Sequence, residues 1–340
     1  MLKVFKAIVF ILFYFLCLTG IGQDIHFSQF ESTPLNLSPT QTGDFNHDFR
    51  AVTNHRNQWQ SVTVPYLTIS ASVEGKTYVI QSIKPDFLAF GLLLNADKAG
   101  DGNLGTTQFK FSMAYHHLFK NNLLQSMVFG FNTGYNYQSI DYTKLNFGNQ
   151  FNGFWFDENA YSGEVFENNR LSYFDFSAGL QATVMLDTIR LTSGIVYHHI
   201  NHPQQSFNNA VNSDLDGKFN VYLLGNWALN ANNMFLPSII YYRQGVLTET
   251  DLGGILKHRT RQLAFPNIYF GGWIRWKDAV IIKVGFDYRN ITFGLSYDIN
   301  FSKLYVASRG NGGYEISIIY QFDKKLKSDM PYLHHCPVFM

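Results

Sequence analysis

Histidine and cysteine side chains that could bind a metal ion gather at two places in the chain. The groups are His198-His199 with His202, and His334-His335-Cys336 near the end. Structural zinc sites usually combine two paired clusters into four tetrahedral ligands, and neither group has a second cluster at such spacing. Adjacent side chains of a strand point to opposite faces, so His198 and His199 are expected to face apart. We predict strand-end or aromatic-girdle histidines for the first group, and keep a metal site as the lesser alternative for the second.

A glycine-rich run could in principle bind a nucleotide. Gly100-Asp101-Gly102-Asn103-Leu104-Gly105 has the spacing of the dinucleotide fingerprint. That fingerprint needs a helix directly after it, whose N-terminus binds the phosphates, whereas the residues that follow here alternate as a strand. Asp97 and Asp101 could bind calcium, but the spacing of an EF-hand loop is absent. We therefore predict a polar hairpin loop and no cofactor.

The residue types of a serine hydrolase are present without a recognisable arrangement. A lipase built on a membrane barrel needs Ser, His and an acid held together on the outside of its strands, and no trio here stands out by spacing. Gly253-Gly254 and Gly271-Gly272 are interpreted as bulges or sites of close packing. We predict that the protein is not an enzyme, and a barrel enzyme acting on lipid is the least favoured alternative.

The elements that would position these residues are best represented by residues 291–301, ITFGLSYDINF. The odd positions of this stretch are all apolar or aromatic, and its even positions are polar or small with a single charge. A period of two indicates a β-strand between two unlike media. Apolar side chains on one face and Gly, Ser and Asn on the other fit a strand with lipid outside and a crowded or water-filled lumen inside.

Composition supports a membrane β-barrel. Of 340 residues, 17% are aromatic and only 15% are charged, against roughly 25% charged in soluble domains. The mean hydropathy of -0.10 is too polar for a bundle of membrane helices. The net charge of +1 gives no reason to expect nucleic acid as a partner.

The first 22 residues are expected to be a signal peptide. Lys3 and Lys6 precede an apolar run from 7 to 18, and Gly20 and Gly22 stand at the small positions of a cleavage site. An uncleaved membrane anchor is the alternative. After cleavage only Cys336 remains, so no internal disulfide is expected.

The rest of the chain divides into three parts. Residues 23–48 hold no periodic strand and are predicted to be a lead-in, on the periplasmic side or plugging the barrel mouth. Residues 49–323 are predicted to be a transmembrane antiparallel β-barrel of about 14 strands, an even number as closure requires. Residues 324–340 form a periplasmic tail. The expected strands lie near 49–59, 65–75, 86–97, 105–117, 124–139, 171–186, 188–200, 216–230, 233–244, 246–257, 265–276, 278–289, 291–301 and 313–323.

The spacing of the strands also predicts their orientation. The longest gaps, near 140–170, 201–215 and 302–312, all follow odd-numbered strands, whereas very short gaps follow even-numbered ones. Long extracellular loops and short periplasmic turns are typical of outer-membrane barrels. The longest loop contains Phe154, Trp155 and Phe156, an aromatic group that could bind a partner or form the core of the loop itself.

Energetics predicts which strand face meets lipid. A lysine on the lipid face near the midplane costs about 2–4 kcal/mol, so Lys283 is expected to point inward. On the same basis Phe293→Arg should block insertion, while Gly294→Arg should be milder.

Several short motifs together resemble one known family. They are Asp24-Ile25-His26-Phe27-Ser28-Gln29-Phe30, Pro34-Leu35-Asn36-Leu37-Ser38-Pro39 with Gly43, Arg56-Asn57-Gln58-Trp59, Asp97-Lys98-Ala99-Gly100, Ser296-Tyr297-Asp298-Ile299-Asn300, Gly312-Gly313-Tyr314-Glu315-Ile316-Ser317, and Cys336-Pro337. Over essentially the whole mature chain, this set resembles the PorP/SprF family of type IX secretion-system outer-membrane proteins of Bacteroidota. The chain departs from the family at Thr40, His55 and Val338, where Ala, Tyr and Arg are usual. Any binding role of that Arg is therefore open here.

The resemblance implies a non-enzymatic barrel of the type IX secretion and gliding machinery. It implies contact with periplasmic and outer-membrane components of that machinery, and export or anchoring of one cell-surface adhesin. On this basis the lead-in and the tail would face the periplasmic machine, and the loops 140–170 and 201–215 would face cargo. Candidate partner-binding residues are Arg56, Asn57, Gln58, Trp59, Phe154, Trp155, Phe156, Cys336 and Pro337. The alternative is a passive porin or small-molecule transporter.

Overall fold

A computed structural model of the chain describes residues 24–60, 64–78, 86–121, 123–164, 166–208, 213–302 and 305–324. The expected signal peptide, most of the expected tail, and with it Cys336 and Pro337, lie outside the described residues. None of the helices in the described ranges is long and apolar enough to cross a membrane.

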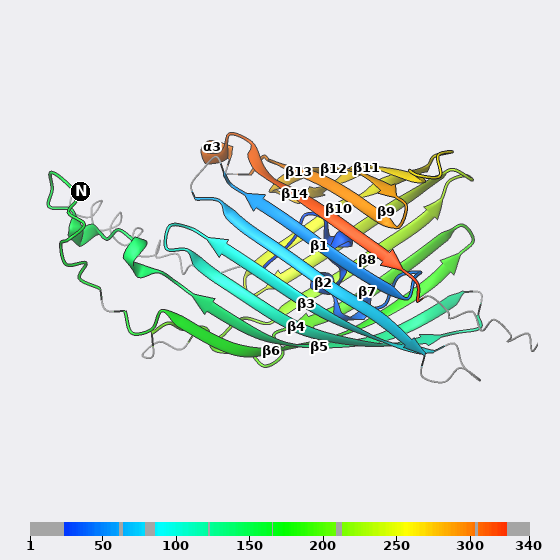
Figure 1. The fold of residues 1–340 in the computed structure, drawn as a ribbon, viewed down its shortest axis with the longest axis horizontal. Helices are drawn as coiled ribbons and strands as arrows, with labels where there is room; N and C mark the ends of the chain where they lie inside the picture. The colour runs from blue at the N-terminus through cyan, green and yellow to red at the C-terminus, as the bar shows by residue number, and fades with distance from the viewer. Residues whose placement is uncertain are drawn as a thin grey trace, which may run out of the picture.

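The described chain folds into fourteen strands that close into one barrel (Figure 1). Every strand pairs antiparallel with its neighbour in sequence, and β1 closes the barrel against β14, from Phe49 opposite Phe322 to Gln58 opposite Gly313. The predicted fold class is therefore confirmed. The strands are β1 (Phe49–Gln58), β2 (Tyr66–Tyr78), β3 (Phe87–Ala99), β4 (Leu104–Leu118), β5 (Leu124–Ser139), β6 (Arg170–Leu186), β7 (Ile189–His198), β8 (Lys218–Ala228), β9 (Asn233–Gln244), β10 (Leu247–Arg259), β11 (Asn267–Arg275), β12 (Ala279–Tyr288), β13 (Ile291–Asn300) and β14 (Asn311–Phe322).

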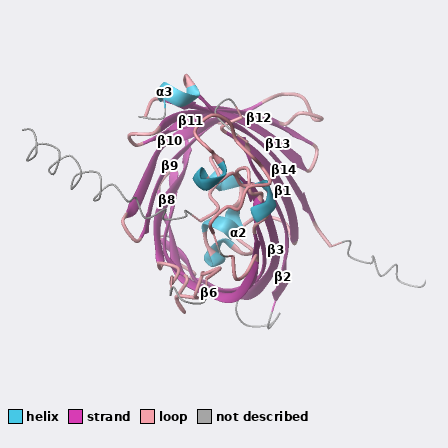
Figure 2. Cartoon of the chain, turned by 90° about the vertical axis from the view of Figure 1, so that its left-hand side faces the viewer, coloured by secondary structure: helices cyan, strands magenta, loops and turns pink. Residues whose placement is uncertain are grey.

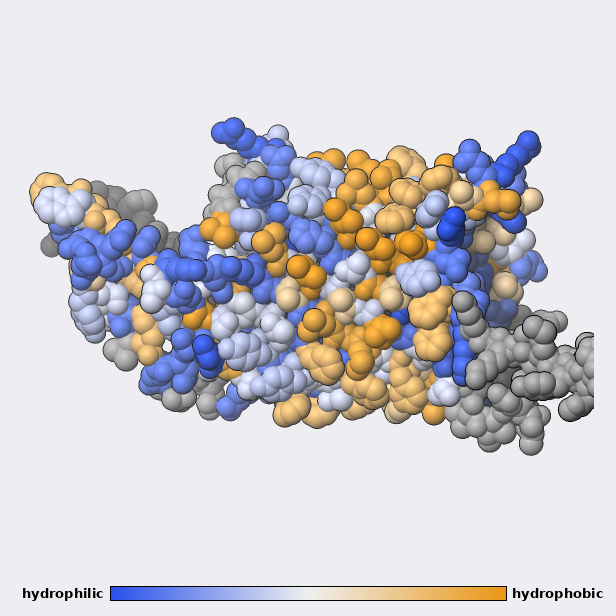
Figure 3. Space-filling model, viewed as in Figure 1, coloured by the Kyte–Doolittle hydropathy of each residue, from blue (hydrophilic) through white to orange (hydrophobic). Residues whose placement is uncertain are grey.

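The two faces of the strands carry the predicted side chains. On β13, Leu295 and Ile299 are exposed on the outside, whereas Ser296 and Asp298 are buried inside. The same alternation in the other strands gives the barrel an apolar outer surface (Figure 3). A band of exposed aliphatic and aromatic side chains is what the hydrocarbon layer of an outer membrane requires.

The two ends of the barrel differ in the length of their connections. Residues 140–169, 199–217 and 301–310 all connect strands at one end, here called the long-loop end, and the first of them projects far beyond the barrel (Figure 1). The opposite end, here called the short-turn end, has two-residue turns at 187–188 and 289–290. The long-loop end corresponds to the cell exterior in barrels of this class.

The predicted alternation of long and short connections does not extend to every hairpin. The connections after β9 and β11 lie at the long-loop end and span only 245–246 and 276–278, while 260–266 lies at the short-turn end. At the long-loop end, the connections after β9 and β11 are therefore short, whereas the connection after β5 is the projecting loop.

Residues 24–48 lie inside the barrel (Figure 2). We call this segment the lead-in. It folds into three very short helical turns, η1 (Phe30–Ser32), α2 (Pro34–Leu37) and η2 (Pro39–Gln41). Two of these turns begin with a proline, whose fixed φ suits the first helical position. Since the lead-in occupies the interior, the lumen and its contents are the first candidate site.

Candidate functional site

The first residues of the lead-in are bound at the long-loop end of the lumen. The carboxylate of Asp24 lies 3.6 Å from Lys218 Nζ and 3.4 Å from His199 Nε2. His199 Nδ1 lies 2.9 Å from Asp175 on β6. Burial by itself would raise the pKa of Asp24, but Lys218 and His199 outweigh it and hold the pKa well below its usual range. Burial likewise opposes the charge on His199, yet Asp24 and Asp175 raise its pKa.

The expectation that His198 and His199 face apart was wrong. β7 ends at His198, and His199 adopts a positive φ of 58° that turns its side chain back into the lumen. Both side chains are buried, with His198 within 3.0 Å of Ser177 Oγ. His202 lies in the following loop, 3.2 Å from a backbone carbonyl. The prediction of strand-end histidines describes this group.

A second group of charges binds residues 28 and 29 of the lead-in. The Ser28 hydroxyl donates to Asp298 at 2.7 Å, and the Ser28 backbone N–H donates to Glu315 at 2.8 Å. Arg56 and Arg275 each place a guanidinium nitrogen 3.3 Å from the same Asp298 carboxylate. Leaving one member of such a buried set without its partner typically costs about 3–5 kcal/mol. We call these five residues the Asp298 cluster.

The middle of the lead-in packs on β11, β12 and β13. The Phe30 ring meets Trp273 edge-on at 5.0 Å between centroids. Lys283 points inward as predicted, where its ammonium contacts Glu31 and donates to Ser32 Oγ at 3.0 Å. A Cβ on Gly294 would lie 2.6 Å from Gln29 Oε1. The prediction that Gly294→Arg is milder than Phe293→Arg remains untested, and the structure adds a cost to Gly294→Arg because the lead-in already fills the space beside this position.

Farther along, hydroxyl and amide groups fix the lead-in to β6 and β8, and its backbone lies against β5. Thr40 Oγ1 lies 2.7 Å from the Tyr222 hydroxyl, which donates to Gln181 Oε1 at 2.7 Å. A Cβ on Gly130 would collide with the backbone at Pro39 and Thr40. The close approach of the lead-in to β5 thus requires glycine at this position.

At the short-turn end, one buried carboxylate joins the lead-in to the barrel wall. Glu74 on β2 accepts from Arg50 Nε at 2.8 Å and from the backbone N–H of Gly43 at 2.8 Å. Arg50 also donates to the Gln41 carbonyl at 3.1 Å. The lead-in is therefore fixed at both ends of the lumen and in between.

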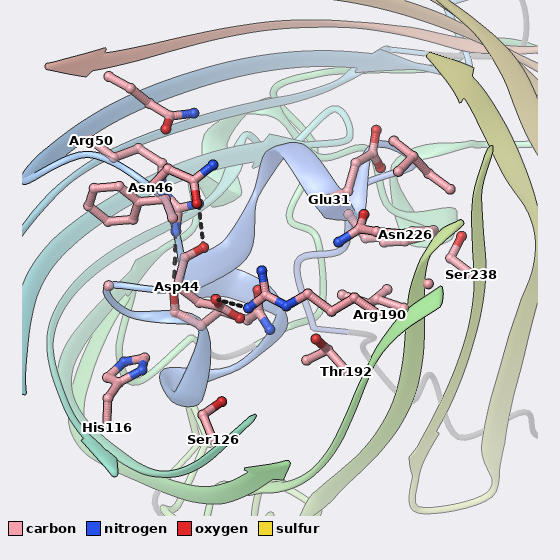
Figure 4. Close-up of a pocket in the computed structure, with 18 of the residues that line it drawn as sticks. Glu31, Asp44, Asn46, Arg50, His116, Ser126, Arg190, Thr192, Asn226 and Ser238 are labelled. Carbon is pink, nitrogen blue, oxygen red and sulfur yellow. Dashed lines mark hydrogen bonds and ion pairs between the residues drawn. The ribbon is translucent and has the colours of Figure 1, made fainter. Parts of the chain in front are cut away.

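A cavity of about 460 Å³ remains around the lead-in, lined by residues of β1 to β5, β7 to β11 and β14. Figure 4 shows Arg190 extending into this space from β7 toward Asp44 of the lead-in, at 3.6 Å. Phe30, Leu224, Leu236, Ile255 and Trp273 supply an apolar part of its lining.

The four adjacent residues Arg56 to Trp59, predicted as partner-binding, do not form one surface. Arg56 and Asn57 are buried, and Arg56 donates to the His26 carbonyl and to Asp298. Gln58 is partly buried. Trp59 ends the strand with a positive φ of 59° and packs edge-on against Tyr66 at 5.0 Å. In the structure, Arg56 contacts the lead-in of its own chain.

The aromatic group of the longest loop is exposed. Phe154 and Trp155 are 87% and 64% exposed and Phe156 is 39% exposed, beyond the long-loop rim. The core of this loop is built by other rings, since Tyr142 stacks on Phe166 at 3.9 Å. Phe154 and Trp155 are therefore available for contact with a partner.

Sequence reasoning missed the residues that hold the lead-in. Asp298, Glu315, Arg275 and Glu74 come from four different strands. A usable signal was present: each is a charged residue on the lumen-facing row of its strand, where Asn, Ser and Gly are the commoner residues. A charge in that row needs a partner. The wall supplies one to Asp298, Arg275 and Glu74, whereas the Glu315 carboxylate accepts from backbone N–H groups of the lead-in.

A closed 14-stranded barrel with an apolar outer belt and a polar interior defines a multi-pass protein of the outer membrane. The family model described as type IX secretion system membrane protein PorP/SprF matches residues 19–320. The chain belongs to this family, as its motifs predicted, and it is an outer-membrane component of the type IX secretion system. Membership implies association with other components of that system.

Comparison with solved structures gives distant similarities to other barrels. The toluene transporter TbuX of Ralstonia pickettii is 8% identical, with a TM-score of 0.49 over 85% of this chain and 94% of that one. The CymD monoaromatic hydrocarbon channel is 11% identical, with a TM-score of 0.49 over 89% and 96%. The translocator domain of the autotransporter NalP from Neisseria meningitidis is 10% identical, with a TM-score of 0.45 over 87% and 96%. No curated protein matches the chain.

Proposed function

We propose that this barrel exports or holds one specific adhesin at the cell surface on behalf of the type IX secretion and gliding machinery, and that it is not a passive pore. The observation that carries the proposal is the projecting loop 140–169, which presents Phe154 and Trp155 beyond the long-loop rim. Exposed aromatic side chains of this kind are typical anchors of protein interfaces. An adhesin that has crossed the membrane would meet this loop first.

The contents of the lumen argue against the alternative of a passive porin. Contacts of the lead-in run from Asp24 beside Lys218 at the long-loop end to Gly43 beside Glu74 at the short-turn end. A water-filled channel needs a continuous polar passage, and here the lead-in occupies the path. Reconstituted protein should therefore give no steady single-channel conductance in planar bilayers.

The path of the lead-in also changes where machine contacts are expected. Asp24 lies near the long-loop end, and only the last residues of the segment, 44–48, lie at the short-turn rim. Periplasmic components would therefore contact the rim residues, such as His47, which lies 3.0 Å from Asp323. The remainder of the lead-in acts as a plug.

The test is the double substitution Phe154→Ser with Trp155→Ser in cells that express the adhesin. We expect the adhesin to disappear from the surface while the barrel itself remains in the outer membrane. Val246→Ser is the matched control, since Val246 is 78% exposed in a turn at the same end. Affinity purification of the solubilised barrel, followed by mass spectrometry, should recover the adhesin with the parent and the control only. Full surface display by the double variant would refute the proposed role of this loop.

A further inference from the structure

A pocket lies on the outer surface of the barrel, near the long-loop end of β13, β14 and β1. Tyr297, Tyr314 and Asn57 stand opposite one another in register across these three strands. They belong to the lipid-facing row, because Ile316, two residues along β14 from Tyr314, is 43% exposed on the outside. The three strands lie side by side in Figure 1, with the long-loop end on the left. We call this space the girdle pocket.

The girdle pocket is lined mainly by uncharged polar groups. Its volume is about 250 Å³, just below the roughly 300–1,000 Å³ typical of small-molecule sites, so it can hold one ring but no long chain. None of the described residues that line it carries a charge. They are Asn57, Gln60, Tyr297, Asn311, Gly312, Gly313 and Tyr314.

Two glycines at the start of β14 shape the pocket. Gly312 lies at a bulge, since Asp298 pairs with Gly313 and Ile299 pairs with Asn311. A Cβ on Gly312 would lie 2.6 Å from the Asp298 carbonyl oxygen, and a Cβ on Gly313 would lie 2.5 Å from the carbonyl oxygen of Asn57. Any other residue would collide with the neighbouring backbone at these two positions. They therefore contribute backbone alone to the lining.

Asn57 is the residue that points to a ligand. Leu67, opposite Asn57 on β2, is 37% exposed to lipid, as this row requires. Asn57 is only 8% exposed, and its side-chain oxygen Oδ1 is buried without a hydrogen-bond partner. A buried acceptor without a donor is costly, and the hydrocarbon layer offers no water to satisfy it. A hydroxyl or N–H group of a bound molecule would supply the missing donor.

The two tyrosines favour a sugar as that molecule. Tyr297 is 42% exposed, and its hydroxyl donates to Asn311 Oδ1 at 3.1 Å. A tyrosine ring combines a flat apolar face with a polar tip, so it can pack against the C–H face of a sugar ring while neighbouring amides bind the sugar hydroxyls. A phosphate is a poorer fit, because phosphate sites are built from cations and the described lining has none.

The position of the pocket identifies where the sugar comes from. Aromatic side chains near strand ends mark the membrane–water interface of a barrel, and the long-loop end faces the cell exterior. The outer leaflet of an outer membrane consists largely of glycolipid, whose sugars lie at this height. We propose that the girdle pocket binds one sugar ring of an outer-leaflet glycolipid, with Asn57 Oδ1 accepting a hydrogen bond from a sugar hydroxyl. This site is independent of the proposed contact between the projecting loop and an adhesin.

The test measures lipid binding by the full chain, purified in detergent, using native mass spectrometry. One probe is lipid A, a phosphorylated glucosamine disaccharide with acyl chains. The other is cardiolipin, which also has phosphates and acyl chains but no sugar. We expect the first lipid A molecule to bind about two- to tenfold more tightly than the first cardiolipin, as one added hydrogen bond would give.

Asn57→Leu removes the amide and leaves an apolar side chain on the lipid-facing row. The affinity for lipid A should fall by about two- to tenfold, whereas the affinity for cardiolipin should stay unchanged. Thr53→Leu is the matched control, because Thr53 is exposed on the same row of β1 and does not line the pocket. If Asn57→Leu fails to fold, Asn311→Ala, at an exposed lining position, replaces it with the same expected loss.

Three results would overturn the proposal. Equal affinity of the parent for lipid A and cardiolipin would show ordinary contact with boundary lipid. Unchanged binding of lipid A by Asn57→Leu and by Asn311→Ala would show that the sugar binds elsewhere on the barrel. A parallel loss of lipid A and cardiolipin in Asn57→Leu would show that the pocket recognises phosphate or acyl chains.

Discussion

Removing the carboxylate of Glu74 should release the short-turn end of the lead-in. The Glu74 side chain is fully buried and accepts hydrogen bonds from Arg50 and from the Gly43 backbone. In Glu74→Ala the buried Arg50 guanidinium loses its partner, which typically costs about 3–5 kcal/mol. At about 1.4 kcal/mol for each tenfold change, the population with residues 42–48 undocked should rise by about two to three and a half orders of magnitude.

A cysteine at position 42 measures that population. Thr42 is fully buried, with its hydroxyl 2.7 Å from Ser112, so a Thr42→Cys thiol reacts with maleimide only when the segment opens. In a Cys17→Ser, Cys336→Ser background, the labelling rate should rise with the undocked population while the barrel remains folded. Glu164→Ala, at an exposed loop position, is the control. A Glu74→Ala rate within a few-fold of the parent rate would refute the reasoning that this carboxylate holds the plug.

A double variant distinguishes the loss of the Glu74 hydrogen bonds from the cost of leaving the Arg50 charge without a partner. Arg50→Met together with Glu74→Ala removes both members of the pair, and replacing a buried ion pair by apolar groups is often neutral. The double variant should therefore label much more slowly than Glu74→Ala alone. If it labels at least as fast, the hydrogen bond to Gly43 carries the stabilisation and the charge of Arg50 does not.

Three further predictions concern other parts of the barrel. Leu295→Arg puts a cation on the lipid face and should destabilise the inserted barrel by about 2–4 kcal/mol, measured as folding yield in vesicles, whereas Leu263→Arg, at a loop position that is 98% exposed, should fold like the parent. Gly130→Leu should displace the lead-in at Pro39 and Thr40 and produce conductance in planar bilayers where the parent gives none; a silent, folded variant would contradict this. Docking of Asp24 should be firmest at about pH 4–6.5. The pKa of His199 is raised in the folded protein, so the stabilisation from His199 is complete below the pKa of unfolded histidine and is lost as the pH rises through the folded-state pKa. The pKa of Asp24 is lowered, so the stabilisation from Asp24 is lost as the pH falls through its folded-state pKa. Maleimide labelling of Ile25→Cys across pH, corrected for thiol ionisation, should have its minimum in that range, and Asp24→Asn should abolish the minimum.

The barrel could be predicted from the sequence because every strand has one face toward lipid and one face toward the lumen. A side chain such as Leu295 or Ile299 is selected by the acyl chains outside, and its neighbour Ser296 or Asp298 by the interior. The resulting period of two is local, so it is visible within ten residues and fixes the strand edges closely. The exposure of Phe154 needed the structure, since the same residues would fit the core of the loop.

The fold of the lead-in could not be predicted in the same way, because this segment is not a strand with lipid on one face and the lumen on the other. Its partners are single charged or polar groups on distant strands: Ser28 meets Asp298, and Gly43 meets Glu74. Such pairings leave no periodic pattern, and the expectation for His198 and His199 failed for a related reason, a single positive φ at the strand end. The reverse inference is nevertheless available. Since a buried charge without a partner is costly, lumen-facing charges such as Glu315 and Lys283 require either water or a segment of chain to meet them, and the lead-in does so through the Ser28 backbone N–H and the Glu31 carboxylate.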